Sequence, residues 1–70
     1  MSAAATDYRA KILTQIATYQ ALAMTADKIE QYVAFVGKEH ALRAQIKPLS
    51  DAEQHQIARE TAQRIMDYNS

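Results

Sequence analysis

The segment from Ile12 to Ala26 (ILTQIATYQALAMTA) contains no charged side chain, although charged residues are frequent elsewhere in the chain. Its composition and apolar spacing predict a helix, and a helix without charges is usually covered on more than one side. A chain of 70 residues has little material of its own with which to cover it. We therefore expect a second subunit or another protein to cover part of this helix.

The composition gives a second reason to expect self-association. Hydrophobic residues make up 49% of the chain, but fourteen of them are alanines, which bury little area each. Domains of this size commonly need disulfides, a metal or a second subunit for stability. The chain has no cysteine, which removes disulfides and thiolate zinc sites. A homodimer is the remaining expectation.

The charge balance and the uncharged segment argue against two classes of partner. Eight basic and eight acidic residues give zero formal net charge, so no overall field attracts nucleic acid or anionic lipid. The uncharged segment is too short to span a bilayer and carries Gln15 and Gln20, which argues against a membrane helix. The N-terminus lacks the basic and apolar regions of a secretory signal. We expect a cytoplasmic protein without a membrane partner.

Residues 1–6 are predicted to be a flexible lead-in, and a single helical domain is predicted over residues 7–68. The first helix is expected from about Asp7 to Ala23. One stripe of this helix holds mostly large side chains: Tyr8, Ile12, Ile16, Tyr19 and Ala23. A flatter, alanine-rich face beside it holds Ala10, Leu13, Ala17, Ala21 and Met24. Two apolar faces predict a central helix with two neighbours.

The next helix, after Thr25, carries two apolar stripes that do not coincide. Its first half aligns Ile29, Tyr32, Val33 and Val36 on one stripe. After Gly37 the pattern rotates, and a second apolar surface holds Phe35, Leu42 and Ile46, which either folds inward at a kink or docks on a partner. This rotation predicts a kink or a break at Gly37.

The last helix begins with the strongest local signal in the chain. Pro48 disfavours helical geometry at Lys47, and the segment from Ser50 to Glu53 has the pattern of a capping box. An amphipathic helix is predicted from Asp51 to about Tyr68. The fold class is therefore all-α, a small bundle of three helices, or four if the chain breaks at Gly37, which we expect to dimerise.

Residues suited to catalysis or metal binding are few. The two histidines, His40 and His55, occur in no known metal-binding spacing, and the chain has no glycine-rich loop. No serine, histidine and acid are placed to converge as a catalytic set. We predict a protein that is not an enzyme and has no catalytic, metal or cofactor site.

The basic residues Lys38, Arg43 and Lys47 surround the turn at Pro48 and suggest one alternative function. A dimeric transcriptional regulator would use them to contact nucleic acid. However, they spread around the helix, and Asp51 and Glu53 would face phosphate at the start of the following helix. Nucleic-acid binding is thus the second hypothesis.

The first hypothesis is a module that docks an apolar and tyrosine-bearing helical face on a partner protein, as inhibitors, adaptors and antitoxin-like regulators do, including those of phages and plasmids. Tyrosine is common at interfaces because its ring can be buried while its hydroxyl stays solvated. The predicted interface, for itself or for a protein target, comprises Leu13, Ala17, Tyr19, Ala21, Met24, Tyr32, Phe35, Leu42 and Ile46.

Overall fold

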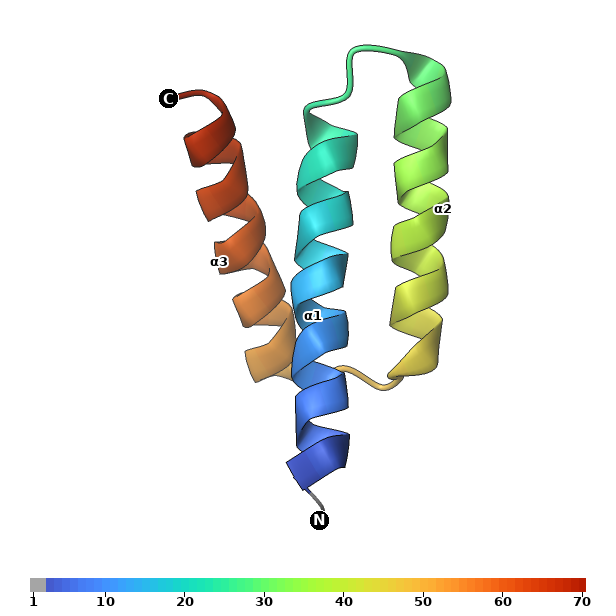
Figure 1. Cartoon of the computed structure of the whole chain (residues 1–70), viewed down its shortest axis with the longest axis vertical. Coiled ribbons are helices and arrows are strands. Elements are labelled where there is room, and N and C mark those ends of the chain that lie inside the picture. Colours follow the sequence, from blue (N-terminus) through green and yellow to red (C-terminus); the bar gives the residue numbers. More distant parts are fainter. Residues whose placement is uncertain (1–2) are drawn as a thin grey trace.

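The computed structural model describes residues 3–70 of the backbone, with side chains from Asp7 onward. It contains three helices: α1 (Ala3–Met24), α2 (Ile29–Gln45) and α3 (Asp51–Tyr68). Short connections join them (Figure 1), and no strand occurs within the described range. The predicted all-α class with three packed helices is confirmed.

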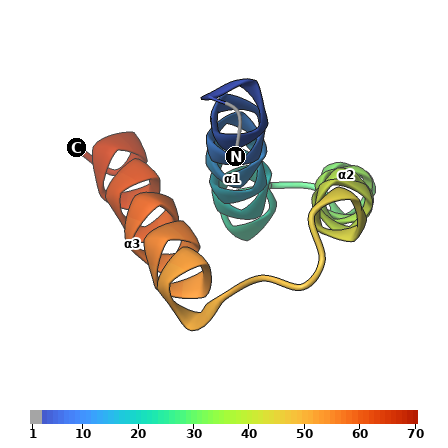
Figure 2. The ribbon, with the colours of Figure 1, turned by 90° about the horizontal axis from the view of Figure 1, so that it is seen from below.

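Helix α1 lies between the other two helices. It packs against both α2 and α3, whereas these two do not contact one another within the part of the chain that the structure describes. Figure 2, a view from below, shows α1 between α3 and α2 and offset from the line that joins these two helices. The prediction of a central first helix with two neighbours is therefore confirmed, and the bundle has an open rather than a closed cross-section.

Helix α1 starts earlier than the sequence predicted. Its backbone is helical from Ala3, where the sequence analysis placed a lead-in that continued to Thr6. Alanine has the highest intrinsic helix propensity, so the alanine triplet at positions 3–5 extends the helix by about one turn. Met1 and Ser2 lie outside the described residues.

Helix α2 passes through Gly37 without a break. Glycine is less favourable than alanine in a helix interior by about 1 kcal/mol, which the surrounding helix-forming residues can offset. The backbone dihedral φ of Gly37 is not positive, and a Cβ atom placed there would meet no heavy atom within 4 Å. The structure therefore has one continuous helix across Gly37, and the predicted kink stays a prediction.

Helix α3 begins with the predicted capping box. The backbone amide of Glu53 donates to the Ser50 hydroxyl at 3.1 Å, and the Ser50 amide donates to the Glu53 carboxylate at 2.9 Å. These two bonds satisfy amides that the first turn of a helix leaves without partners. The connection before Ser50 includes a cis peptide bond between Lys47 and Pro48.

The hydrophobic core is small and draws on all three helices. It consists of buried residues with two partly buried leucines packed against them: Ile12, Leu13, Ile16, Ala17, Ile46 and Ile57, with Leu42 and Leu49. Ile16 is fully buried at the centre of α1. Within residues 3–70, none of the helices has the length and apolarity needed to cross a membrane.

Candidate protein interface

The alanine-rich face of α1 is covered by the chain's own helices. Leu13, Ala17 and Ala21 expose 5%, 0% and 6% of their surface. Small side chains allow neighbouring helices to approach closely, and here that neighbour belongs to the same chain. These three residues, which were predicted to contact a partner, are therefore buried within the folded chain, whereas Met24 of the same face is exposed.

The second apolar surface of α2 also turns toward α1. Ile46 is part of the core, Leu42 packs against it, and the ring of Phe35 lies 6.2 Å from the ring of the half-buried Tyr19. An unbroken α2 can direct only one of its two stripes at α1. Ile46 is therefore buried, whereas Phe35 and Leu42 are partly buried against α1.

The first stripe of α2 faces solvent as a result. Ile29, Tyr32 and Val33 expose 69%, 46% and 61% of their surface, and only Val36 is partly buried. This stripe of α2 therefore lies mostly outside the core. The core lies near the other end of α2, next to Ile46, so the start of α2 has little of α1 to cover it.

The exposed large hydrophobic residues gather mostly at one end of the bundle. This end, at the top of Figure 1, combines the end of α1, the start of α2 and the end of α3. The exposed residues there are Leu22, Met24, Ile29, Tyr32, Val33, Met66 and Tyr68. Of the nine predicted interface residues, Met24 and Tyr32 belong to this exposed set.

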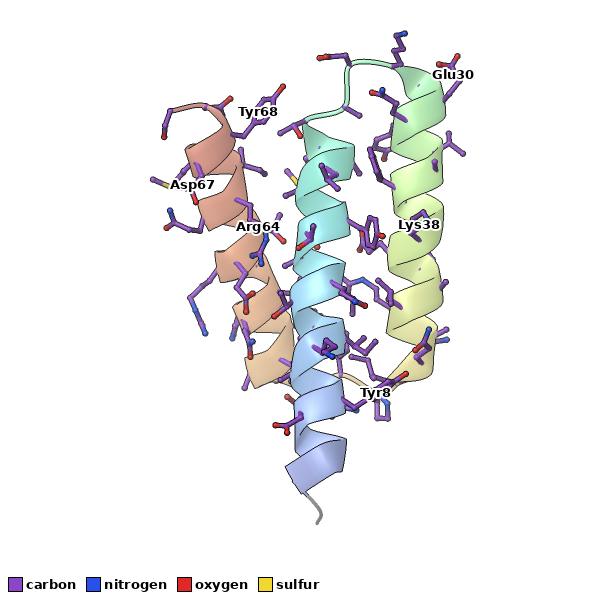
Figure 3. All side chains as sticks on the ribbon, viewed as in Figure 1. Tyr8, Glu30, Lys38, Arg64, Asp67 and Tyr68 are labelled. Atoms are coloured by element: carbon purple, nitrogen blue, oxygen red, sulfur yellow. The ribbon has the colours of Figure 1, made fainter. Side chains whose placement is uncertain are left out.

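A pocket of about 130 Å³ opens between α1 and α3 at this end. It is lined by residues of both helices and of the turn after α1: Thr18, Ala21, Leu22, Thr25, Arg64 and Tyr68. Figure 3 shows Arg64 and Tyr68 on the C-terminal half of α3, with Tyr68 near the end of α1. Leu22 and Tyr68 expose 40% and 64% of their surface beside the pocket.

The two threonine hydroxyls and one nitrogen of Arg64 in the pocket lining are already paired within the chain. The hydroxyls of Thr18 and Thr25 donate to the carbonyl oxygens of Thr14 and Ala21, both at 2.9 Å. The guanidinium group of Arg64 donates to the Glu60 carbonyl at 3.1 Å and to its carboxylate at 3.4 Å. The pocket therefore offers methyl groups and an aromatic ring, a surface suited to an apolar side chain.

The pocket was not predicted from the sequence. Leu22 lies among polar residues of α1 such as Thr18 and Gln15, and an apolar residue in that position is the one signal that could have pointed to it. Arg64 carries a charge and gives no such signal. Their proximity depends on how α3 packs against α1, which no local pattern encodes.

The three basic residues do not converge on one patch. The ammonium group of Lys38 lies 5.8 Å from the centre of the Tyr19 ring. Arg43 forms an ion pair with Glu39 at 2.7 Å and donates to the Gln20 side chain at 3.3 Å. Lys47 is exposed in the connection after α2. Two of the three cations therefore already have partners within the chain.

The histidines are both exposed, and neither belongs to a cluster of ligands. No group of three or more His, Cys, Asp or Glu side chains able to hold a metal ion occurs among the described residues. No protein family, curated protein or solved structure matches the chain. The functional proposal accordingly starts from the geometry.

Proposed function

We propose that this chain is a non-enzymatic protein-interaction module that receives an apolar side chain of a target protein in the pocket between α1 and α3. The observation that carries this proposal is the combination of internally paired polar atoms in the pocket with the exposed Leu22 and Tyr68 beside it. An apolar anchor in such a pocket, surrounded by residues that exclude water, is a common centre of binding energy.

The size of the pocket suits one anchor residue. An apolar cavity of about 150 Å³ binds benzene, so a volume of about 130 Å³ accommodates a branched aliphatic or small aromatic side chain. Arg64 lines the pocket on the C-terminal half of α3 (Figure 3) and provides a polar group at its rim. A target helix with one exposed Leu, Met or Phe fits this arrangement. Binding would then act by occluding or recruiting the target, as inhibitors and adaptors do.

Nucleic-acid binding has less support. A phosphate contact requires a free cation, whereas Arg43 is paired with Glu39 and Lys38 lies over Tyr19. The start of α3 carries Asp51 and Glu53, whose charges oppose phosphate there.

The decisive experiment uses NMR to measure the binding of short amphipathic helical peptides, each carrying a single apolar anchor residue. We expect the amide signals of Thr18, Leu22 and Tyr68 to shift together, and Leu22→Glu to abolish binding. The matched control is Met66→Glu, which changes an exposed apolar residue outside the pocket. Equal binding by both variants would reject the pocket as the docking site.

A further inference from the structure

A second exposed surface lies on α2, which we call the outer face. It consists of six apolar or small residues, all exposed: Ile29, Val33, Ala34, Gly37, Ala41 and Ala44. None of the residues in Ile29–Gln45 is buried. A surface helix normally directs polar side chains toward water, and on this face only Glu30 and His40 do so.

The spacing of these residues forms a continuous ridge. Ile29, Val33, Gly37 and Ala41 follow one another at intervals of four residues, so they align along one side of the helix. Gly37 lies at the middle of α2, and the space above it is open. Another helix can therefore approach the backbone of α2 closely at this point.

The accessible surface area of the chain is larger than that expected for a compact monomer of its mass. Its accessible surface is 4970 Å², whereas a compact monomer of 7.9 kDa exposes about 4,400 Å². The surplus, about 550 Å², exceeds the roughly 500 Å² that each partner contributes to the smallest specific interfaces.

The outer face is complementary in shape and charge to the outer face of a second copy of the chain. In an antiparallel pair centred on Gly37, the large Ile29 and Val33 of one copy lie over the small C-terminal half of α2 in the other. Glu30, near the start of α2, then lies near His40 and Lys47 of the other copy. The helix dipoles also oppose one another in this arrangement. With zero net charge, the two copies do not repel each other overall.

We infer that two copies of this chain pair through the outer faces of α2, antiparallel and about a two-fold axis at Gly37. Such an isologous pair is closed and does not extend into a filament. This interface is separate from the pocket between α1 and α3, so each dimer would carry two free pockets. The inference therefore stands or fails independently of the proposed function.

The first test is the molar mass by light scattering on a sizing column over a wide dilution series. The wild type should elute at twice 7.9 kDa and dissociate only at the lowest concentrations. Val33→Glu should raise the dissociation constant by about thirtyfold or more, with an unchanged helix content by circular dichroism. The control Met66→Glu, on an equally exposed residue of α3, should leave the dimer intact.

The second test determines the register. Because the chain has no cysteine, Gly37→Cys introduces the only thiol. At a two-fold axis the two residues approach within disulfide range, about 4.4–6.8 Å between Cα atoms. Mild oxidation should link Gly37→Cys into a covalent dimer, while Ala62→Cys on the exposed side of α3 stays unlinked. A monomeric wild type, or a dimer insensitive to Val33→Glu, would overturn the pairing. Failure of Gly37→Cys to cross-link would overturn the two-fold axis at Gly37.

Discussion

Arg9 and Glu53 join α1 to the first turn of α3 through two charge-assisted hydrogen bonds. The Nε and Nη2 atoms of Arg9 donate to the two carboxylate oxygens of Glu53, each at 2.7 Å. The same guanidinium group donates to the Pro48 carbonyl at 3.2 Å. Because Glu53 is also the carboxylate of the capping box, one side chain both starts α3 and attaches it to α1.

This double role predicts a loss of stability in acid. The hydrogen bond from Arg9, followed by that from the Ser50 amide, lowers the pKa of Glu53 from 4.5 to about 2. A carboxyl group with a lowered pKa in the folded state stabilises the fold above its unfolded pKa. That stabilisation is therefore complete above about pH 4.5 and declines as the pH falls toward 2.

The measurement is the melting temperature between neutral pH and pH 2. Glu53→Gln should melt lower than the wild type at neutral pH and should show a weaker decline in acid. Asp7→Asn, which changes an exposed carboxylate on α1, is the control. If wild type and Glu53→Gln decline in parallel, the ion pair does not contribute to folding.

Thr61 offers a route to a more stable protein. It exposes 4% of its surface, and its hydroxyl oxygen has no hydrogen-bond partner among the described residues. A buried polar group without a partner destabilises a fold by about 1–3 kcal/mol. Thr61→Val keeps the shape and removes the hydroxyl, so we expect a gain of about 1 kcal/mol in the free energy of unfolding. Chemical denaturation would measure it, with Thr18→Val, whose hydroxyl is bonded, as the control. A loss of stability would show that the Thr61 hydroxyl is bonded in solution.

Ala17→Glu distinguishes a core position from an interface position. Ala17 is fully buried beneath the chain's own helices, so a carboxylate there would lack both space and a partner. We expect Ala17→Glu to unfold the chain rather than only to separate subunits, and circular dichroism would detect the loss of helix. Ala62→Glu, at an exposed alanine of α3, should retain the fold. If Ala17→Glu is a folded monomer, the alanine-rich face is an interface between subunits after all.

Gly37→Ala examines the continuity of α2. The added Cβ atom meets nothing within 4 Å, and alanine is the better helix former by about 1 kcal/mol. At protein concentrations low enough to keep the chain monomeric, the variant should unfold at a higher denaturant concentration. A destabilised variant would mean that Gly37 adopts a conformation in solution that alanine cannot.

A salt series addresses nucleic-acid binding. Affinity that depends on phosphate contacts falls steeply as salt increases. Since Arg43 and Lys38 already interact with Glu39 and Tyr19, we expect no measurable binding to duplex DNA even at low salt by fluorescence anisotropy. Salt-sensitive binding that Lys47→Glu weakens would instead favour the nucleic-acid hypothesis over the protein-interaction module.

The helices themselves were predictable because their signals are local. The capping box at Ser50 and Glu53, the turn at Pro48 and the apolar periodicity of α1 each involve residues within one or two helical turns. The two apolar faces of α1 also predicted its central place between α2 and α3. These features need no knowledge of the neighbouring helices.

Which face of α2 turns inward was decided only by the tertiary structure. The sequence presents two apolar stripes of similar quality, and the choice depends on which one meets Ile12 and Ile16 when α2 packs along α1. Leu42 and Ile46 pack with them, and Phe35 lies beside Tyr19, so Ile29 and Val33 remain exposed. The pocket at Leu22 and Tyr68 arises in the same way, because contacts between helices depend on their packing, whereas helix formation depends on neighbours in the chain.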